Sequence, residues 1–157
     1  MAPDAWQDDD LLAAWSALLR IHAALVPVID AELTSQTGIP LGWYDVMLEL
    51  YSAPDRRMRM TELGHAAVLS RSRVSRVVDE LERNGYLTRV PNPDDRRSSY
   101  AALTAQGRAA FRKAAPSYLA AIRSRMGAVM AARDATVLRS LLEGALQRLD
   151  ETEGARR

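Results

Sequence analysis

The sequence predicts a mainly α-helical fold that is interrupted by one β-hairpin. Apolar residues recur at every third or fourth position through most of the chain, which is the spacing of one buried helix face. Two short β-prone segments flank a turn rich in proline and aspartate. The chain has 157 residues, of which 48% are hydrophobic and 26% charged, and it is therefore long enough to bury a core.

The N-terminal part predicts one long helix and one short helix. Helical spacing runs from Leu11 to Leu33. The apolar stripe of this helix consists of Trp15, Leu18, His22, Leu25 and Ile29. Pro27 lies inside the pattern and should bend the helix or remove one of its hydrogen bonds. The segment "SQTGIP" ends the helix, and Trp43–Tyr51 predicts a second, shorter one.

The middle of the chain predicts two further short helices. After the loop "SAPDRR", a third helix runs from about Glu62 to Val68, with Thr61 as its cap. Ser70 is a suitable N-cap for a fourth helix, and Gly85 suits the left-handed position after its end. The buried stripe of the fourth helix consists of Val74, Val77, Val78 and Leu81. Its outer side favours two ion pairs, Arg76–Glu80 and Asp79–Arg83.

A hairpin and two long helices complete the predicted fold. Tyr86–Val90 and Ser98–Leu103 are predicted as paired strands, with "PNPDDRR" as the turn between them. Thr104 then caps a long helix that Pro116 should bend, and Asp134 caps the last helix. The apolar stripe of the last helix consists of Val137, Leu138, Leu141, Leu142, Ala145, Leu146 and Leu149.

The composition excludes several kinds of function. The chain has no cysteine, which excludes disulfides, thiolate metal sites and thiol-based redox sensing. His22 and His65 show no metal-ligand spacing, so we expect no metal and no cofactor. The N-terminal segment lacks the regions of a signal peptide, and no apolar run approaches the length of a membrane span. We therefore expect a soluble, cytoplasmic protein without a membrane partner.

The charges are unevenly distributed, although the net charge is only +1. Residues 1–55 contain nine acidic residues and one basic residue, whereas residues 56–97 contain ten arginines and six acidic residues. Residues 98–157 contain ten basic and five acidic residues. An anionic partner would therefore meet the middle of the chain.

The fourth predicted helix begins with an unusual cluster of arginines. Arg71, Arg73 and Arg76 lie at the amide end, which carries partial positive charge and normally attracts acidic residues. The cluster becomes favourable when a polyanion lies against it. Two short helices followed by a hairpin predict a winged helix-turn-helix, whose second helix enters a DNA major groove with its N-terminus first. The hairpin tip is long enough to reach the neighbouring minor groove, where arginine is favoured.

The segment Met60–Arg108 resembles the core of the multiple antibiotic resistance regulator (MarR) family. The matching features are "SRVVDELERNG", the wing tip "PDDRR", and the "L-T-x-x-G" entry to the next helix. The resemblance implies a homodimeric transcriptional regulator of double-stranded DNA, in which repression is the commoner outcome. It also implies that residues 1–40 and 104–157 form dimerisation helices and that residues 41–103 form the DNA-binding domain. We expect a two-fold dimer on a pseudo-palindromic site.

The resemblance implies a set of residues that contact DNA. In the recognition helix these are Ser70, Arg71, Ser72, Arg73, Ser75 and Arg76. In the wing, Asp95 holds the tip, Arg96 enters the minor groove and Arg97 contacts the backbone. The alternative for the wing residues is an exposed turn without a ligand.

Many members of the MarR family release DNA when a small aromatic or phenolic ligand binds. The candidates for such an effector pocket in this chain are Trp15, His22, Trp43, Tyr44 and Met47. Aromatic and methionine side chains at helical spacing more often form plain core, and His22 also fits a hydrogen-bonded position in a dimer core.

Two other classes of function are weaker alternatives. An enzyme would need Ser70 or Ser75 as a nucleophile, or Asp94 with Asp95 as a carboxylate pair. The serines have no nearby base and no glycine-rich elbow, and adjacent carboxylates in a turn are more simply turn-formers. A helical protein-interaction module, whose wing binds protein, is the second alternative. Steep salt dependence of duplex binding would distinguish a DNA-binding protein from that module.

Overall fold

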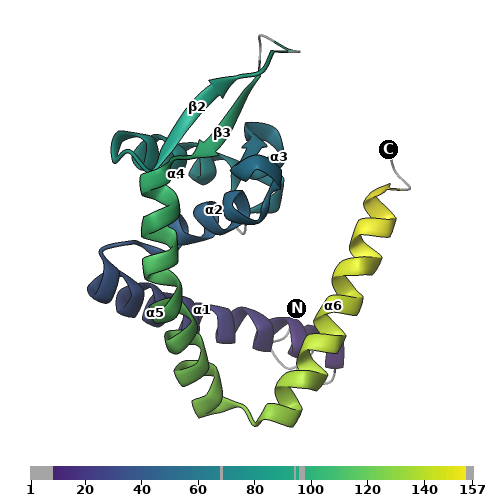
Figure 1. Cartoon of the computed structure of the whole chain (residues 1–157). Coiled ribbons are helices and arrows are strands. Elements are labelled where there is room, and N and C mark those ends of the chain that lie inside the picture. Colours follow the sequence, from purple (N-terminus) through teal and green to yellow (C-terminus); the bar gives the residue numbers. More distant parts are fainter. Residues whose placement is uncertain (1–8, 68, 94, 96–97, 155–157) are drawn as a thin grey trace. The chain divides into compact units, whose positions relative to one another are not determined.

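The computed structural model describes residues 9–67, 69–93, 95 and 98–154. The chain forms two compact units, Met1–Ala121 and Ile122–Arg157. The described elements (Figure 1) are α1 (Asp10–Thr37), α2 (Leu41–Ser52), the 3₁₀ turn η2 (Pro54–Arg56), β1 (Arg57–Arg59), α3 (Met60–Ala66), α4 (Arg71–Arg83), β2 (Leu87–Pro91), β3 (Ser99–Leu103), α5 (Ala105–Val129) and α6 (Ala132–Gly154).

Helix α1 is continuous through Pro27 and ends at Gly38, whose φ of 73° is left-handed. Asp9 caps its start by accepting hydrogen bonds from the first amides of the helix. By length and composition α1 is apolar enough to cross a membrane, because Arg20 is the single charged residue between positions 11 and 29. The expectation that no segment reaches this length is therefore wrong for α1. A helix that buries its apolar face against protein has the same composition.

The core of the first unit forms where α2, α3 and α4 pack together with the sheet. Its fully buried members include Leu33, Met47, Leu50, Leu63 and Leu81. The predicted stripe of α4 is confirmed, since each of its four apolar residues is at most 6% exposed. Burial of this stripe fixes which side of α4 faces solvent.

The sheet has three strands in the order β1-β3-β2, and both pairs are antiparallel. The two strands of the hairpin were predicted, and Figure 1 shows them projecting beyond the helices that surround them. Strand β1 was not predicted, because its three residues, "RMR", carry no β-prone run and lie in a segment that reads as loop. Its pairing with β3 is a long-range contact between Arg57–Arg59 and Tyr100–Ala102.

Two predicted helix caps are wrong. Thr61 lies inside α3, because Arg59 is the N-cap and its backbone N–H donates to Glu62 Oε2 at 3.2 Å. Asp134 lies in the first turn of α6, where the carbonyl of Ala131 accepts from the amides of residues 134 and 135.

The junction between α4, β2 and α5 agrees with the prediction. Gly85 has a φ of 74°, and the amides of Gly85 and Tyr86 donate to the carbonyls of Glu82 and Leu81, which is a Schellman end. Thr104 Oγ1 accepts from the amide of Gly107 at 3.0 Å and therefore caps α5. Its hydroxyl donates to the carbonyl of Gly85 at 2.7 Å, which joins the start of α5 to the end of α4.

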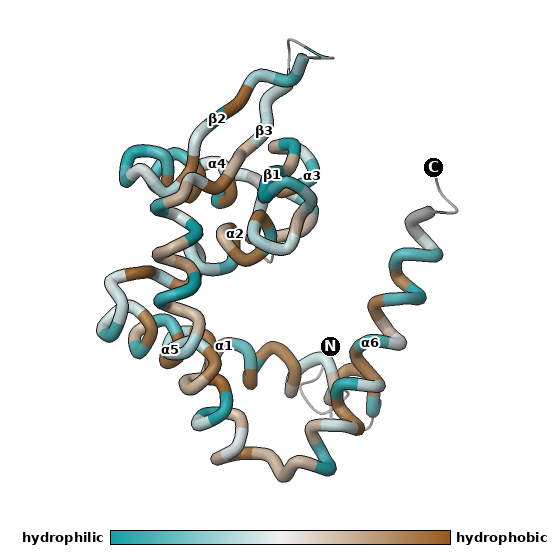
Figure 2. The backbone as a smooth tube through the Cα atoms, viewed as in Figure 1, coloured by the Kyte–Doolittle hydropathy of each residue, from teal (hydrophilic) through white to brown (hydrophobic). Residues whose placement is uncertain are grey.

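The long terminal helices expose large apolar side chains in a single chain. Figure 2 shows these hydrophobic positions along α1 and α6. On α1 the most exposed are Leu11 and Trp15, at 81% and 56%. On α6 the exposed apolar residues are Val137, Leu141, Leu142, Leu146 and Leu149. Such a stripe normally packs against protein.

The carboxyl group of Asp45 on α2 is partly buried, which makes the stability of the fold depend on pH. Burial, together with the smaller effects of the neighbouring carboxylates of Glu49 and Asp30, raises its pKa to about 6. Because the pKa is about 4 in the unfolded chain, the folded state binds this proton more tightly. The stabilisation from Asp45 is therefore present below about pH 4 and is lost as the pH rises through about 6.

Asp45→Asn is expected to stabilise the protein at pH 7.5 by about 1 kcal/mol and to have little effect at pH 4.5. The expected gain in stability is no larger because the Asp45 carboxyl group is partly exposed and solvent screens its charge. Thermal unfolding at both pH values measures the difference, with Asp150→Asn on the exposed face of α6 as the control. An equal gain in Tm at the two pH values would contradict a raised pKa for Asp45 in the folded protein.

Candidate nucleic-acid interface

Helix α4 divides into a buried face and an exposed face. Val74, Val77, Val78 and Leu81 anchor it in the core. Five of the six residues expected to meet DNA are exposed on the opposite side, namely Ser70, Ser72, Arg73, Ser75 and Arg76. The sixth, Arg71, begins the helix, and its side chain lies outside the described part of the structure. Packing of the apolar face therefore leaves two arginines and three serines on the exposed side of α4.

The N-terminus of α4 has no side-chain cap among the described residues. Ser70 occupies the N-cap position, as predicted, but no side-chain oxygen among the described residues accepts a capping hydrogen bond there. The hydroxyls of Ser70 and Ser72 instead lie 3.3 Å apart. The first amides of a helix have no partner within the helix, so an anion at this end would accept from them.

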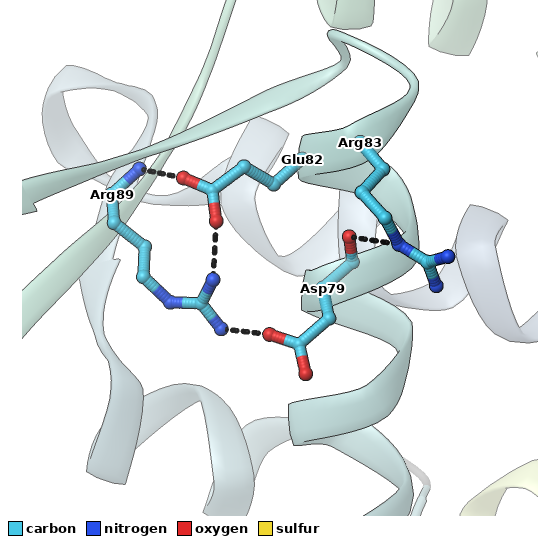
Figure 3. Close-up of polar contacts among 4 residues, drawn as sticks. All are labelled: Asp79, Glu82, Arg83 and Arg89. Carbon is cyan, nitrogen blue, oxygen red and sulfur yellow. Dashed lines mark hydrogen bonds and ion pairs between the residues drawn. The ribbon is translucent and has the colours of Figure 1, made fainter.

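Arg89 of β2 joins the wing to the recognition helix (Figure 3). Its guanidinium donates to Asp79 and to Glu82 of α4, and its backbone amide donates to Glu82 Oε1 at 2.9 Å. The hydrogen bond to Asp79 raises the pKa of Arg89 above its usual range, and Glu82 adds to the effect. We call these three residues the α4–β2 clamp. The clamp holds the hairpin against the helix.

The two ion pairs predicted along α4 do not form as predicted. The carboxylate of Asp79 binds Arg89, and Arg83 donates instead to the backbone carbonyl of Asp79 at 3.3 Å. Glu80 Oε2 accepts from the indole N–H of Trp43 at 2.8 Å. Arg89 of β2 and Trp43 of α2 therefore take the place of the predicted partners on α4. The sequence of α4 alone cannot predict partners that come from other elements.

The base of the wing is organised by Asn92. This side chain is only 2% exposed, and its amide donates to Ser98 Oγ at 2.8 Å across the turn. The backbone amide of Ser98 donates to the carbonyl of Asp95 at 3.0 Å, and Asp95 is exposed. Arg96 and Arg97, the predicted DNA contacts at the tip, lie outside the described residues. Asn92 was not singled out from the sequence, although asparagine before Pro93 signals a turn.

A family model described as the MarR family matches residues 37–98. Sco3205, a MarR family transcriptional regulator from Streptomyces coelicolor whose crystal structure was determined in complex with DNA, is 30% identical. The two structures agree with a TM-score of 0.77 over 87% of this chain and 86% of that chain. This chain belongs to the MarR family.

Two further comparisons agree with the MarR assignment. AbsC, a MarR family transcriptional regulator from Streptomyces coelicolor, is 27% identical with a TM-score of 0.77, over 91% of this chain and 97% of that one. The HTH-type transcriptional repressor YetL from Bacillus subtilis is 27% identical over 93 residues, which are 59% of this chain. The chain spans about half the length of YetL, at 53%. These relatives are transcriptional regulators and not enzymes.

The five residues proposed for an effector pocket of this MarR protein lie in two different environments. Tyr44 and Met47 belong to the core and are 3% and 0% exposed, and the partly buried Trp43 packs against this core. Tyr44 also stacks on Phe111 of α5, with ring centroids 5.0 Å apart. Trp15 and His22 are exposed on α1. Three of the five residues thus belong to the core or pack against it, whereas the other two are exposed on α1.

Two open depressions of the MarR fold lie elsewhere. The first has a volume of about 270 Å³ and is lined by Met60, Thr61, Gly64, His65, Val74 and Ser75. This depression lies between α3 and α4. The second has a volume of about 450 Å³ and lies where α2, β1, α3 and β3 meet. No group of three or more histidine or carboxylate side chains among the described residues has the arrangement of a metal site.

Proposed function

We propose that this chain is a transcriptional regulator that binds double-stranded DNA through the N-terminal half of α4 and through the wing. The observation that carries the proposal is the exposed pair Arg73 and Arg76 beside the N-terminus of a well-anchored helix, where no side chain among the described residues forms a cap. Charge of this kind at the positive end of a helix dipole is stabilised when phosphate lies against it. The DNA complex of Sco3205 supports the same role for the related fold.

The regulator acts as a homodimer in this proposal. Residues 1–40 and 104–157 supply the dimerisation helices, and residues 41–103 form the DNA-binding domain. The support is the apolar surface that α1 and α6 expose in a single chain, because surface of this extent is normally covered by protein. A two-fold dimer would place two recognition helices about one helical turn apart, ~10 bp, on a pseudo-palindromic site.

Repression in the cytoplasm is the proposed mode of action, supported by the naming of YetL as a repressor. Release of DNA by a small aromatic ligand is a further part of the proposal. Trp15 and His22 are the exposed candidates for contacting such a ligand, whereas Trp43, Tyr44 and Met47 would act from within the core.

Salt-dependent binding to duplex DNA tests the proposed function. Operator duplexes selected from a random pool are titrated with the protein by fluorescence anisotropy over a range of KCl concentrations. If about six phosphates are neutralised, log Kd should change with log salt with a slope of magnitude roughly 5. Light scattering at micromolar concentration should return a dimer. Absence of duplex binding at low salt would overturn the function, and binding that ignores salt would favour a protein partner.

A further inference from the structure

Three exposed arginines lie in β1 and just before it, outside both the recognition helix and the wing tip. Arg57 and Arg59 alternate with Met58 along the strand, so their side chains leave the same face of the sheet. Met58 packs against the core from the other face. Arg56 precedes them in the turn η2. We call Arg56, Arg57 and Arg59 the β1 arginine patch.

Aromatic rings hold the β1 arginine patch in place. The guanidinium carbons of Arg57 and Arg59 lie 5.1 Å and 5.9 Å from the ring centroid of Tyr100. The guanidinium carbon of Arg56 lies 4.4 Å from the centroid of the Tyr51 ring. A ring positions a cation without cancelling its charge. Arg89 differs, because two carboxylates in the α4–β2 clamp neutralise it.

The carboxylates near the β1 arginine patch reduce its charge only in part. Asp55 Oδ2 lies 3.5 Å from Arg57, but the Asp55 side chain is 76% exposed, so this pair is weak. Glu62 accepts from the backbone amide of Arg59 and is tied to the start of α3. The eight residues from Asp55 to Glu62 contain three arginines and two acids, and their net charge remains +1.

Strand β1 is connected to elements of both parts of the candidate interface. Strand β1 leads directly into α3, and Thr61 and His65 of α3 line the same depression as Ser75 of α4. On its other side β1 pairs with β3, which begins where the wing turn ends. Strand β1 thus lies between α3 and β3, the two elements that lead into α4 and out of the wing. A duplex presents one phosphate charge per about 1.7 Å of its axis.

We propose that the β1 arginine patch binds the sugar–phosphate backbone of DNA and forms a third, sequence-independent contact beside the recognition helix and the wing. The inference rests on the DNA-binding function proposed above. The patch adds affinity for every duplex alike, because it meets phosphates and no base edges.

A triple substitution tests the inference in the full-length protein. Arg56→Gln, Arg57→Gln and Arg59→Gln together remove the charge, and the corresponding triple change to lysine keeps it. Kd is measured by fluorescence anisotropy over a KCl series, for the selected operator duplex and for a scrambled duplex of equal length. The control is Arg133→Gln with Arg139→Gln, two exposed arginines on α6.

The glutamine variant is expected to lose affinity about fivefold per lost phosphate contact at ~0.15 M salt, equally for both duplexes. The magnitude of its salt slope should fall by about 0.9 per contact, and the lysine variant should retain most of the affinity. Unchanged affinity and slope, with wild-type protein still binding, would overturn the inference and leave the function intact. An equal loss in the lysine variant, or a loss confined to the operator, would also overturn it. Failure of wild-type protein to bind either duplex would overturn the function itself.

Discussion

Gly107→Ala is expected to destabilise the first unit by about 3 kcal/mol or more. A Cβ atom at this position would lie 2.0 Å from the backbone carbonyl oxygen of Tyr86 and 3.1 Å from Leu103 Cδ2. The carbonyl cannot move freely, because it accepts from the amide of Thr104 at 3.1 Å. Relief of the clash would also disturb the cap that Thr104 forms at the start of α5. Urea unfolding followed by circular dichroism measures the loss.

Gly127→Ala is the matched control for this prediction, since it makes the same change in the same helix. No described atom lies within 4 Å of a Cβ at Gly127, so the alanine adds helix propensity without a clash. It should stabilise the protein by about 0.5–1 kcal/mol. Similar effects of the two substitutions would show that Gly107 is not held against Tyr86. The close approach also explains the glycine of the "L-T-x-x-G" motif.

Arg73→Ala and Arg76→Ala are each expected to weaken binding to the selected operator by about 1–3 kcal/mol, if the side chain reads a base edge. Both residues are exposed beside the N-terminus of α4, where the helix would meet the major groove first. Competition titrations with operators that carry single base changes measure both the affinity and the preference at each position. An arginine that reads a base should lose its preference at one position.

Arg83→Ala provides the control on the same helix. Arg83 is exposed in the last turn of α4 and donates to the carbonyl of Asp79, far along the helix from its N-terminus. Its removal should change operator affinity by less than about 0.5 kcal/mol. Equal and sequence-independent losses in all three variants would mean that α4 contacts only the backbone.

Local signals in the sequence were sufficient for much of the fold. Gly85 and Thr104 lie at the predicted ends of α4 and α5 because caps depend on a few neighbouring residues. The stripe of α4 was predictable because burial recurs at a fixed period. Strand β1 was missed because its only support is pairing with β3, about 40 residues later in the chain. Thr61 was misassigned because that same strand determines where α3 begins.

The sequence predicted which residues of α4 are exposed at the candidate site, but it did not predict the hydrogen bonds and ion pairs that join α4 to other elements. The exposed side of α4 follows from its buried side, so Arg73 and Arg76 could be placed from the sequence. Arg89 could not, because its carboxylate partners Asp79 and Glu82 come from a different element, and its pairing with Asp79 replaces the predicted Asp79–Arg83 pair. The candidate effector residues lacked any signal that separates pocket from core, and Tyr44 and Met47 proved to be core.

The α4–β2 clamp has a consequence for regulation of the proposed DNA binding. Arg89 ties the hairpin to the helix through a backbone amide and a guanidinium at once, so the two elements should move as one rigid body. In the proposed dimer, the spacing between the major-groove contact and the adjacent minor-groove contact would then be preset within each subunit. An effector would gain little by bending the hairpin away, and it would act instead on the distance between the two rigid bodies of a dimer.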